Sequence, residues 1–198
     1  MSKEGVDLGR RRFLTATTSV VGGAGVAAAL VPFITYMTPS ARARAAGAPV
    51  EVDISKLEAG KKMTVEYRKK PIWIVRRTEK NLTDLPTLND TLADPLSTVP
   101  QQPEYIKDNH RSIKPEFMVV EGLCTHLGCS PTYRPELGAA SGLGDDWKGG
   151  FFCPCHGSTF DLSGRVYAGV PAPTNLIVPP HKYVTDTVII IGEDQGVA

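Results

Sequence analysis

Two short stretches of this 198-residue chain combine cysteine and histidine at close spacing. The first is Cys124-Thr125-His126-Leu127-Gly128-Cys129, and the second is Cys153-Pro154-Cys155-His156-Gly157-Ser158. Each stretch offers soft thiolate ligands and one imidazole at a spacing that fits a loop. All four cysteines of the chain lie in these two stretches. Such clustering indicates a metal site or local disulfides.

Three kinds of site are consistent with these residues. Two cysteines and two histidines could hold zinc, although zinc motifs usually separate paired ligands by two or more residues, whereas one residue separates Cys124 from His126. In an exported protein the four cysteines could instead form disulfides. A Rieske 2Fe-2S centre takes two cysteines on one iron and two histidines on the other. The presence of one histidine with cysteine in both stretches favours the Rieske centre, and the other two sites remain open.

The elements that must position these residues are short strands. Apolar alternation and β-branched runs predict strands over 49–54, 63–69, 72–77, 117–121 and 184–191. Lys70 and Pro71 predict a tight turn between the second and third of them. A short helix is expected over 78–85, irregular structure over 86–115, and a glycine-rich surface insertion over 137–150. We therefore expect a mainly β, antiparallel domain with an inserted, loop-built site.

Composition excludes one class of partner. The net charge is +1 and charged residues make up 22% of the chain. No basic stripe is present, so nucleic-acid binding is not expected. From residue 49 onward there are 16 basic and 19 acidic residues, which leaves the C-terminal body slightly acidic.

The N-terminal segment predicts a membrane anchor. No Asp, Glu, Lys, Arg or His occurs from Phe13 to Ala41, and residues 14–37 are the most apolar. About 24 helical residues span roughly 36 Å, enough to cross a bilayer. The preceding Arg10-Arg11-Arg12-Phe13-Leu14 fits the twin-arginine export pattern, and it also fits a positively charged flank on the cytoplasmic side. Because the apolar run exceeds an ordinary signal core, we expect an uncleaved, single-pass anchor.

The two cysteine–histidine stretches, 124–129 and 153–158, are called the first and second box below. Both boxes resemble the motifs of the Rieske iron–sulfur subunits of bacterial cytochrome bc complexes, the ubiquinol–cytochrome c reductases. The export signal, the anchor and Pro171-Ala172-Pro173 extend the resemblance over nearly the whole chain. It implies a Rieske antiparallel β domain with an inserted cluster-binding subdomain on one transmembrane helix. The expected parts are a cytoplasmic N-terminus with the signal (1–12), the anchor (13–37), a flexible hinge (38–48) and a periplasmic domain (49–198) whose cluster-binding part is about 122–174.

The resemblance also implies roles for individual residues. Cys124 and Cys153 are expected on the buried iron of one 2Fe-2S cluster, with His126 and His156 on the outer iron. His156 is the expected contact with the quinol and the acceptor of its proton and electron.

Other positions of the two boxes match residues with supporting roles in the family. Cys129 and Cys155 are expected to form a disulfide between the loops. The Ser158 hydroxyl is expected to hydrogen-bond the cluster, and Leu127 to shield it and dock. The family often has tyrosine where this chain has Phe160, and losing a donor to a ligand sulfur lowers the reduction potential.

The implied function is electron transfer within an enzyme complex. One electron and one proton would pass from ubiquinol to the cluster, and the electron would reach a c-type cytochrome after the head moves on its hinge. Cytochrome b and the c-type cytochrome are the expected partners, in a dimeric complex of the inner membrane with the N-terminus in the cytoplasm. The alternatives are a Rieske subunit of another periplasmic oxidoreductase, such as arsenite oxidase, and a membrane-anchored zinc-binding module.

Overall fold

The computed structural model describes residues 5, 7–106 and 108–194. The chain divides into two compact units, residues 1–45 and 46–198, and each is considered by itself. The first unit is helical, with α1 (Leu8–Met37) and α2 (Ala41–Ala46).

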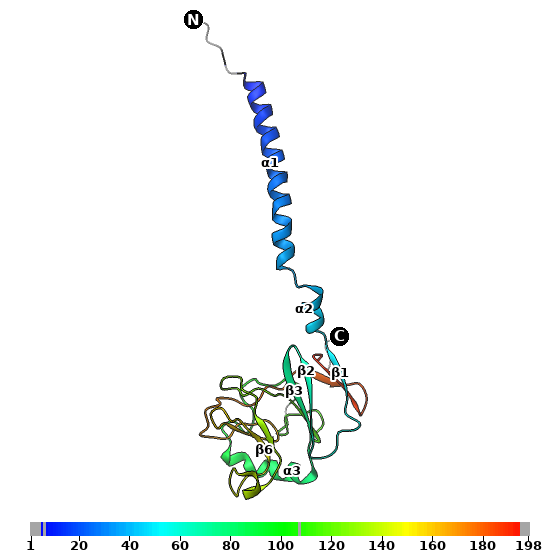
Figure 1. Cartoon of the computed structure of the whole chain (residues 1–198), viewed down its shortest axis with the longest axis vertical. Coiled ribbons are helices and arrows are strands. Elements are labelled where there is room, and N and C mark those ends of the chain that lie inside the picture. Colours follow the sequence, from blue (N-terminus) through cyan, green and yellow to red (C-terminus); the bar gives the residue numbers. More distant parts are fainter. Residues whose placement is uncertain (1–4, 6, 107, 195–198) are drawn as a thin grey trace. The chain divides into compact units, whose positions relative to one another are not determined.

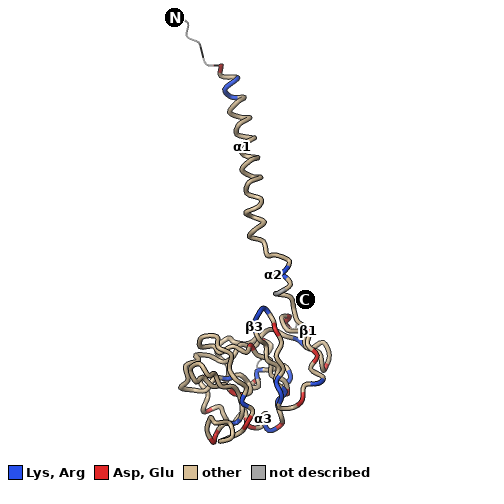
Figure 2. The backbone as a smooth tube through the Cα atoms, in the orientation of Figure 1, with Lys and Arg blue, Asp and Glu red and all other residues tan. Residues whose placement is uncertain are grey.

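Helix α1 begins at Leu8 because Asp7 caps it, with its Oδ1 accepting hydrogen bonds from the backbone N–H groups of Gly9 and Arg10. Its 30 residues extend about 45 Å at 1.5 Å per residue. The helix therefore includes Arg10, Arg11 and Arg12 as well as the apolar residues (Figure 2).

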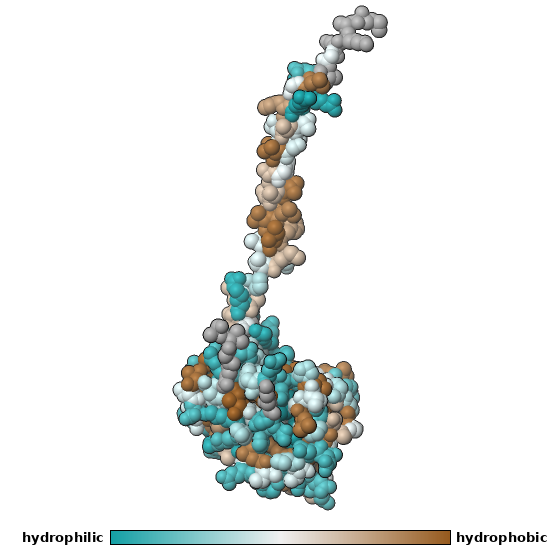
Figure 3. Space-filling view, turned by 180° about the vertical axis from the view of Figure 1, so that it is seen from behind, coloured by the Kyte–Doolittle hydropathy of each residue, from teal (hydrophilic) through white to brown (hydrophobic). Residues whose placement is uncertain are grey.

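None of the side chains of α1 is buried within the protein. Figure 3 shows its apolar surface as brown patches along the middle and C-terminal part of the helix. By length and composition this helix can cross a membrane. The exposed apolar side chains of α1 are stabilised by an apolar surrounding such as a lipid bilayer.

The expected hinge, 38–48, contains the short helix α2. Its N-terminus is capped by the Ser40 hydroxyl, which accepts from the backbone N–H of Ala43. The Arg44 guanidinium donates to the carbonyl of Pro39, 2.8 Å away. Part of this segment is therefore helical.

The second unit is built from short strands, two 3-10 helices (η) and one short α-helix (Figure 1). Its elements are β1 (Val50–Asp53), β2 (Lys62–Tyr67), β3 (Lys70–Arg76), α3 (Glu79–Asp84), η1 (Leu85–Thr91), β4 (Phe117–Glu121), β5 (Thr132–Arg134), η2 (Gly138–Ser141), β6 (Gly150–Phe152), β7 (Thr159–Asp161), β8 (His181–Tyr183) and β9 (Val188–Ile191). The strands form three antiparallel sheets, ordered β1-β9-β8, β2-β3-β4 and β5-β6-β7. This confirms the expected fold class, a mainly β head with one long N-terminal helix.

The sheet β2-β3-β4 contributes to two hydrophobic cores. Successive side chains of a strand point to opposite faces of the sheet. Ile72 and Ile74 of β3 therefore pack with Ile189 of β9 in one core. Trp73 and Val75 pack in the other, which also contains the buried cysteines of both boxes. The core around Ile72, Ile74 and Ile189 and the core that contains the cysteines thus share one supporting sheet.

Two local predictions are wrong. The β2–β3 turn lies at Arg68-Lys69, not at Lys70-Pro71, because both turn residues have positive φ (49° and 61°), as a two-residue hairpin of this hand requires. Such turns usually contain Asn-Gly, so Arg-Lys gave no signal.

The expected strand 184–191 is instead the turn after β8 followed by β9, with the Val184 backbone N–H donating to Val188 O. Asp186, a turn-forming residue, is fully accessible at this turn and pairs with Lys114.

The connecting segments are closer to expectation. The helix predicted over 78–85 is confirmed as α3, with Thr78 as its N-cap and Leu85 as its C-cap. The stretch predicted irregular begins with η1, after which the described residues contain no further helix or named strand until β4. The insertion 137–150 is not only surface, because Trp147 is buried and stacks on Tyr167 with ring centroids 5.7 Å apart.

Candidate metal centre

The small sheet β5-β6-β7 holds both cysteine–histidine boxes. Strand β6 ends at Phe152 and leads directly into Cys153, and β7 begins at Thr159, directly after the second box. Strand β5 follows the first box after two intervening residues, and β4 precedes it. Each box is therefore a loop whose two ends are fixed by strands.

The two loops share one hydrogen-bonding pattern. The backbone N–H of Cys124 donates to Cys129 O, and that of Cys153 donates to Ser158 O, both at 2.7 Å. The N–H of the fifth residue, Gly128 or Gly157, donates back to the first carbonyl at 2.9 Å in each loop. Both glycines have φ near +80°, a conformation that glycine adopts without strain. The first cysteines of the loops thus have equivalent backbone settings.

Cys129 and Cys155 form a disulfide with Cα atoms 6.7 Å apart. This is the pairing that the family resemblance implied. The sulfur of Cys153 lies within 4.8 Å of both disulfide sulfurs. Because a disulfide offers no thiolate, Cys129 and Cys155 are not available as thiolate ligands, and Cys124 and Cys153 are the free cysteines of the protein.

The four predicted ligands lie on these two loops. Cys124 and Cys153 are 3% and 1% exposed. The imidazole rings of His126 and His156 have centroids 4.8 Å apart and nearly perpendicular planes. His126 is half-buried and His156 is exposed. The arrangement has two buried sulfurs and two imidazoles closer to the surface.

Two observations test whether these donors fit a metal cluster. The Nδ1 atom of His126 is buried and has no hydrogen-bond partner, which costs free energy unless a ligand occupies it. Burial raises the pKa of the Cys124 thiol, and the adjacent Cys153 raises it further. Two buried thiolates require a compensating cation, and metal coordination deprotonates a thiol outright. The donor set therefore fits an iron–sulfur cluster with mixed sulfur and nitrogen ligands.

A third segment, Pro171-Ala172-Pro173, is tied to the second loop through Ser158. The backbone N–H of Ala172 donates to the Ser158 hydroxyl oxygen at 3.0 Å. Ser158 is fully buried, and its hydroxyl also lies close enough to the Cys124 sulfur to lower the pKa of that thiol. The first loop is tied to the residue after this segment, because Thr125 Oγ1 donates to Thr174 O at 2.6 Å.

The outer face of the site is apolar and accessible. Leu127, at the tip of the first loop, is 71% exposed. His156, Pro171 and Pro173 are also exposed. An exposed leucine and an exposed imidazole on the two ligand loops can meet an apolar partner that carries a hydrogen-bonding group.

The fold and site define a Rieske-type iron–sulfur protein. The chain matches the family "Rieske [2Fe-2S] domain" over residues 49–180 and the family "Ubiquitinol-cytochrome C reductase Fe-S subunit TAT signal" over residues 1–40. It is 61% identical over 198 residues to the ubiquinol-cytochrome c reductase iron-sulfur subunit of Allochromatium vinosum, covering all of this chain and 95% of the relative. It is 44% identical over 200 residues to that of Blastochloris viridis, covering 100% and 99%.

Among solved structures, a chain of "Hyperthermophilic respiratory Complex III" is similar, with a TM-score of 0.49 and 24% identity, covering 88% of this chain and 98% of the other. The chain belongs to the iron–sulfur subunits of ubiquinol–cytochrome c reductase. It carries one Rieske-type 2Fe-2S cluster and is a subunit of an oxidoreductase complex. This membership decides against the zinc-binding module and the arsenite-oxidase alternative.

Some features of the site gave no sequence signal. The bonds from Thr125 to Thr174 and from Ala172 to Ser158 join segments that are distant in the chain. The similarity of the two loops is hidden because the histidine is the third residue of the first box and the fourth of the second. A cysteine at the first position and a glycine at the fifth position of both boxes were the visible signs of it.

Phe160 provides a prediction about the reduction potential. It is fully buried in the core that contains Cys124 and Cys153. We expect Phe160→Tyr to raise the potential, because a hydroxyl donor to a ligand sulfur stabilises the more negative, reduced state. A full hydrogen bond to a charged group is worth about 1.5–3 kcal/mol, which sets an upper limit of roughly 60–130 mV. Protein-film voltammetry measures the change.

Phe152→Tyr is the control, because it adds the same hydroxyl to a half-buried neighbouring strand residue. It should leave the potential near that of the unaltered protein. A potential that stays the same or falls in Phe160→Tyr would show that this position does not face a ligand sulfur.

Proposed function

We propose that this chain accepts one electron and one proton from ubiquinol and delivers the electron to a c-type cytochrome. The observation that carries this proposal is that the exposed His156 imidazole and the exposed Leu127 lie on the two loops that hold the buried Cys124 and Cys153. When bound, the 2Fe-2S cluster supplies one-electron redox chemistry at a site that has imidazole ligands. The proposed ligands are Cys124, His126, Cys153 and His156.

The chain's own residues then have separate tasks. An exposed imidazole nitrogen of His156 accepts a hydrogen bond from the quinol hydroxyl and then its proton. Leu127 excludes water from that contact and packs against the apolar quinol pocket. The disulfide and the links through Thr125 and Ala172 keep the loops in place while the surface meets its partners.

The remaining parts supply location and movement. Residues 1–12 act as the cytoplasmic signal, 13–37 as the single-pass anchor, 38–48 as the hinge, and 49–198 as the periplasmic head. The division into units at Ala45 supports independent movement of the head. Cytochrome b is the proposed partner during quinol oxidation and the c-type cytochrome the partner afterwards, within a dimeric complex.

Leu127→Asp tests this proposal in membranes that contain the whole complex. We expect reduction by ubiquinol to slow at least about tenfold, because a carboxylate at the contact must be desolvated against an apolar pocket. Reduction by ascorbate and the electron paramagnetic resonance (EPR) spectrum should stay normal, since the carboxylate lies outside the ligand set. Rapid mixing with detection of the EPR signal and of the c-type haem provides the measurement.

Val184→Asp is the matched control, because this residue is 55% exposed on the turn between β8 and β9 and belongs to neither box. It should react with ubiquinol at the normal rate. If Leu127→Asp also reacts normally, the quinol does not approach this face and the proposed contact is wrong.

A further inference from the structure

Three arginines are buried in the interior of the head. Arg77, Arg111 and Arg165 are 2%, 0% and 0% exposed and rank among the largest fully buried side chains. Asp161, also 0% exposed, is the one carboxylate of comparable burial among the described residues, and it pairs with Arg165 at 2.8 Å. The four side chains together carry a buried net charge of +2.

Most partners of these arginines are neutral oxygens. Arg111 donates to Ser163 O, Gly164 O and Leu176 O at 2.7–3.2 Å and to Gln102 Oε1 at 2.8 Å. Arg77 donates to carbonyl and hydroxyl oxygens of His110, Ser112, Leu162 and Ser163. Such bonds satisfy the donors of both side chains except the buried Nε of Arg77, and they leave the charge in place. Burial lowers the pKa of Arg77 and of Arg111 to about 10, so both stay protonated near neutral pH.

The charges lie in the same part of the head as the ligand loops. The segment Asp161–Arg165 begins at the end of β7, three residues after the second box. Leu176, whose carbonyl Arg111 binds, is packed in the core that contains Cys124 and Cys153. Leu162, within this segment, and Val166, directly after it, belong to this core too. Leu162 and Leu176, whose carbonyls the arginines bind, are thus packed in the same core as the two cysteines.

We infer that the buried arginines raise the reduction potential of the cluster. Reduction adds one negative charge to the site, and a fixed positive charge favours that state. In a medium of effective dielectric constant about 20, a unit charge about 12 Å away changes such an equilibrium about tenfold. The three arginines are opposed by the buried Asp161, the half-buried Asp94 and the exposed Asp108. Their buried excess of positive charge thus tunes the redox centre, in addition to holding carbonyl groups.

Asn89→Asp tests this inference with almost no change of shape. Asn89 Oδ1 accepts from Arg165 Nη1 at 2.8 Å, so a carboxylate keeps this bond and adds one negative charge. Beside a guanidinium the new carboxylate stays ionised. The full chain in its complex is titrated at pH 7, with the EPR signal as the readout. We expect the ratio of reduced to oxidised protein at fixed potential to fall at least about threefold, which is about 28 mV for one electron.

Asp90→Asn is the control, because it changes the charge by one unit at the exposed neighbour of Asn89 in η1. Its effect should be smaller and should vanish at high salt, whereas the shift in Asn89→Asp should persist. Gln102→Glu, beside Arg111, should lower the potential in the same direction. If Asn89→Asp fails to assemble, the reduction potential of Gln102→Glu tests the inference in its place.

An intact signal with an unchanged potential in the assembled variants would overturn the inference. The arginines would then act as carbonyl caps alone, and the variants would alter only the temperature of unfolding. A shift in Asn89→Asp that disappears at high salt, as in Asp90→Asn, would contradict it equally, because it would place the charge in solvent-screened surroundings.

Discussion

Replacing His156 with alanine is expected to abolish the Rieske EPR signal of the reduced protein. The proposed ligand set has four members, and among the residues that the structure describes no further free cysteine is present to replace a lost one. The other cysteines of the two loops are held in the disulfide and offer no thiolate. His126, the nearest imidazole, is itself a proposed ligand. The measurement is EPR of ascorbate- and dithionite-reduced membranes, with iron content.

His110→Ala is the matched control for this prediction. His110 is half-buried, lies in the loop before β4 and pairs with Asp108 at 3.3 Å, outside both boxes. It should keep a normal signal and iron content. A normal Rieske signal in His156→Ala would falsify the ligand assignment and leave the role of this imidazole open.

Loss of the cluster in His156→Ala should not unfold the whole head. The core of Ile72, Ile74 and Ile189 lies on the face of β2-β3-β4 away from the cysteines. Far-ultraviolet circular dichroism should therefore keep most of its β signal. Loss of that signal together with the cluster would mean that the core of Ile72, Ile74 and Ile189 cannot form without the cluster.

The candidate ligands are visible in the sequence for a physical reason. Ligand atoms must lie close in space, and in each box the candidate ligands also lie close in the chain. Cys124 and His126 are therefore visible as a pair. The disulfide was different, because four cysteines allow three pairings and spacing alone does not choose among them. The pairing of Cys129 with Cys155 came from the resemblance to a family.

The buried arginines show where sequence reasoning stops. Arginine is mostly exposed in proteins, so nothing in the pattern around Arg77 or Arg111 predicts full burial. Their partners are backbone carbonyls brought together by the fold from distant segments. The wrong prediction for the β2–β3 turn has a similar cause. The pairing of β2 with β3 places Arg68 and Lys69 in a conformation that these residues do not favour alone.

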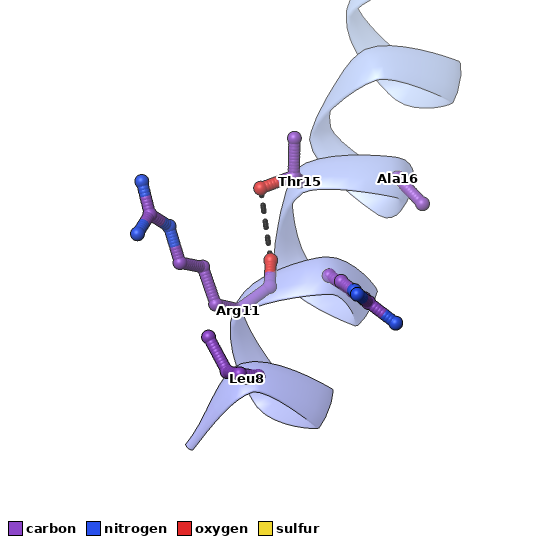
Figure 4. Close-up of a pocket in the computed structure, with 5 residues that line it drawn as sticks. Leu8, Arg11, Thr15 and Ala16 are labelled. Atoms are coloured by element: carbon purple, nitrogen blue, oxygen red, sulfur yellow. Dashed lines mark hydrogen bonds between the residues drawn. The ribbon is translucent and has the colours of Figure 1, made fainter. Parts of the chain in front are cut away.

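The second large effect is expected at the N-terminus, where Arg10→Lys with Arg11→Lys should block export of the folded head. Lysine keeps the positive charge but loses the planar guanidinium with its five donors. The Arg11 side chain extends away from α1, and its carbonyl accepts from Thr15 Oγ1 at 2.8 Å (Figure 4). The guanidinium is thus accessible to an export receptor. The measurement is accessibility of the head to protease added outside the cytoplasmic membrane.

Arg12→Lys is the control that separates the two interpretations of these arginines, because Arg12 occupies the variable position of the export pattern in the same helical turn. Both variants keep the net charge, so a purely electrostatic orienting flank predicts normal export in each. Recognition of the pair predicts failure in the double variant alone. If the head of the double lysine variant is as accessible to the added protease as that of the unaltered protein, Arg10 and Arg11 act only as an orienting charge. The anchor itself would then direct insertion.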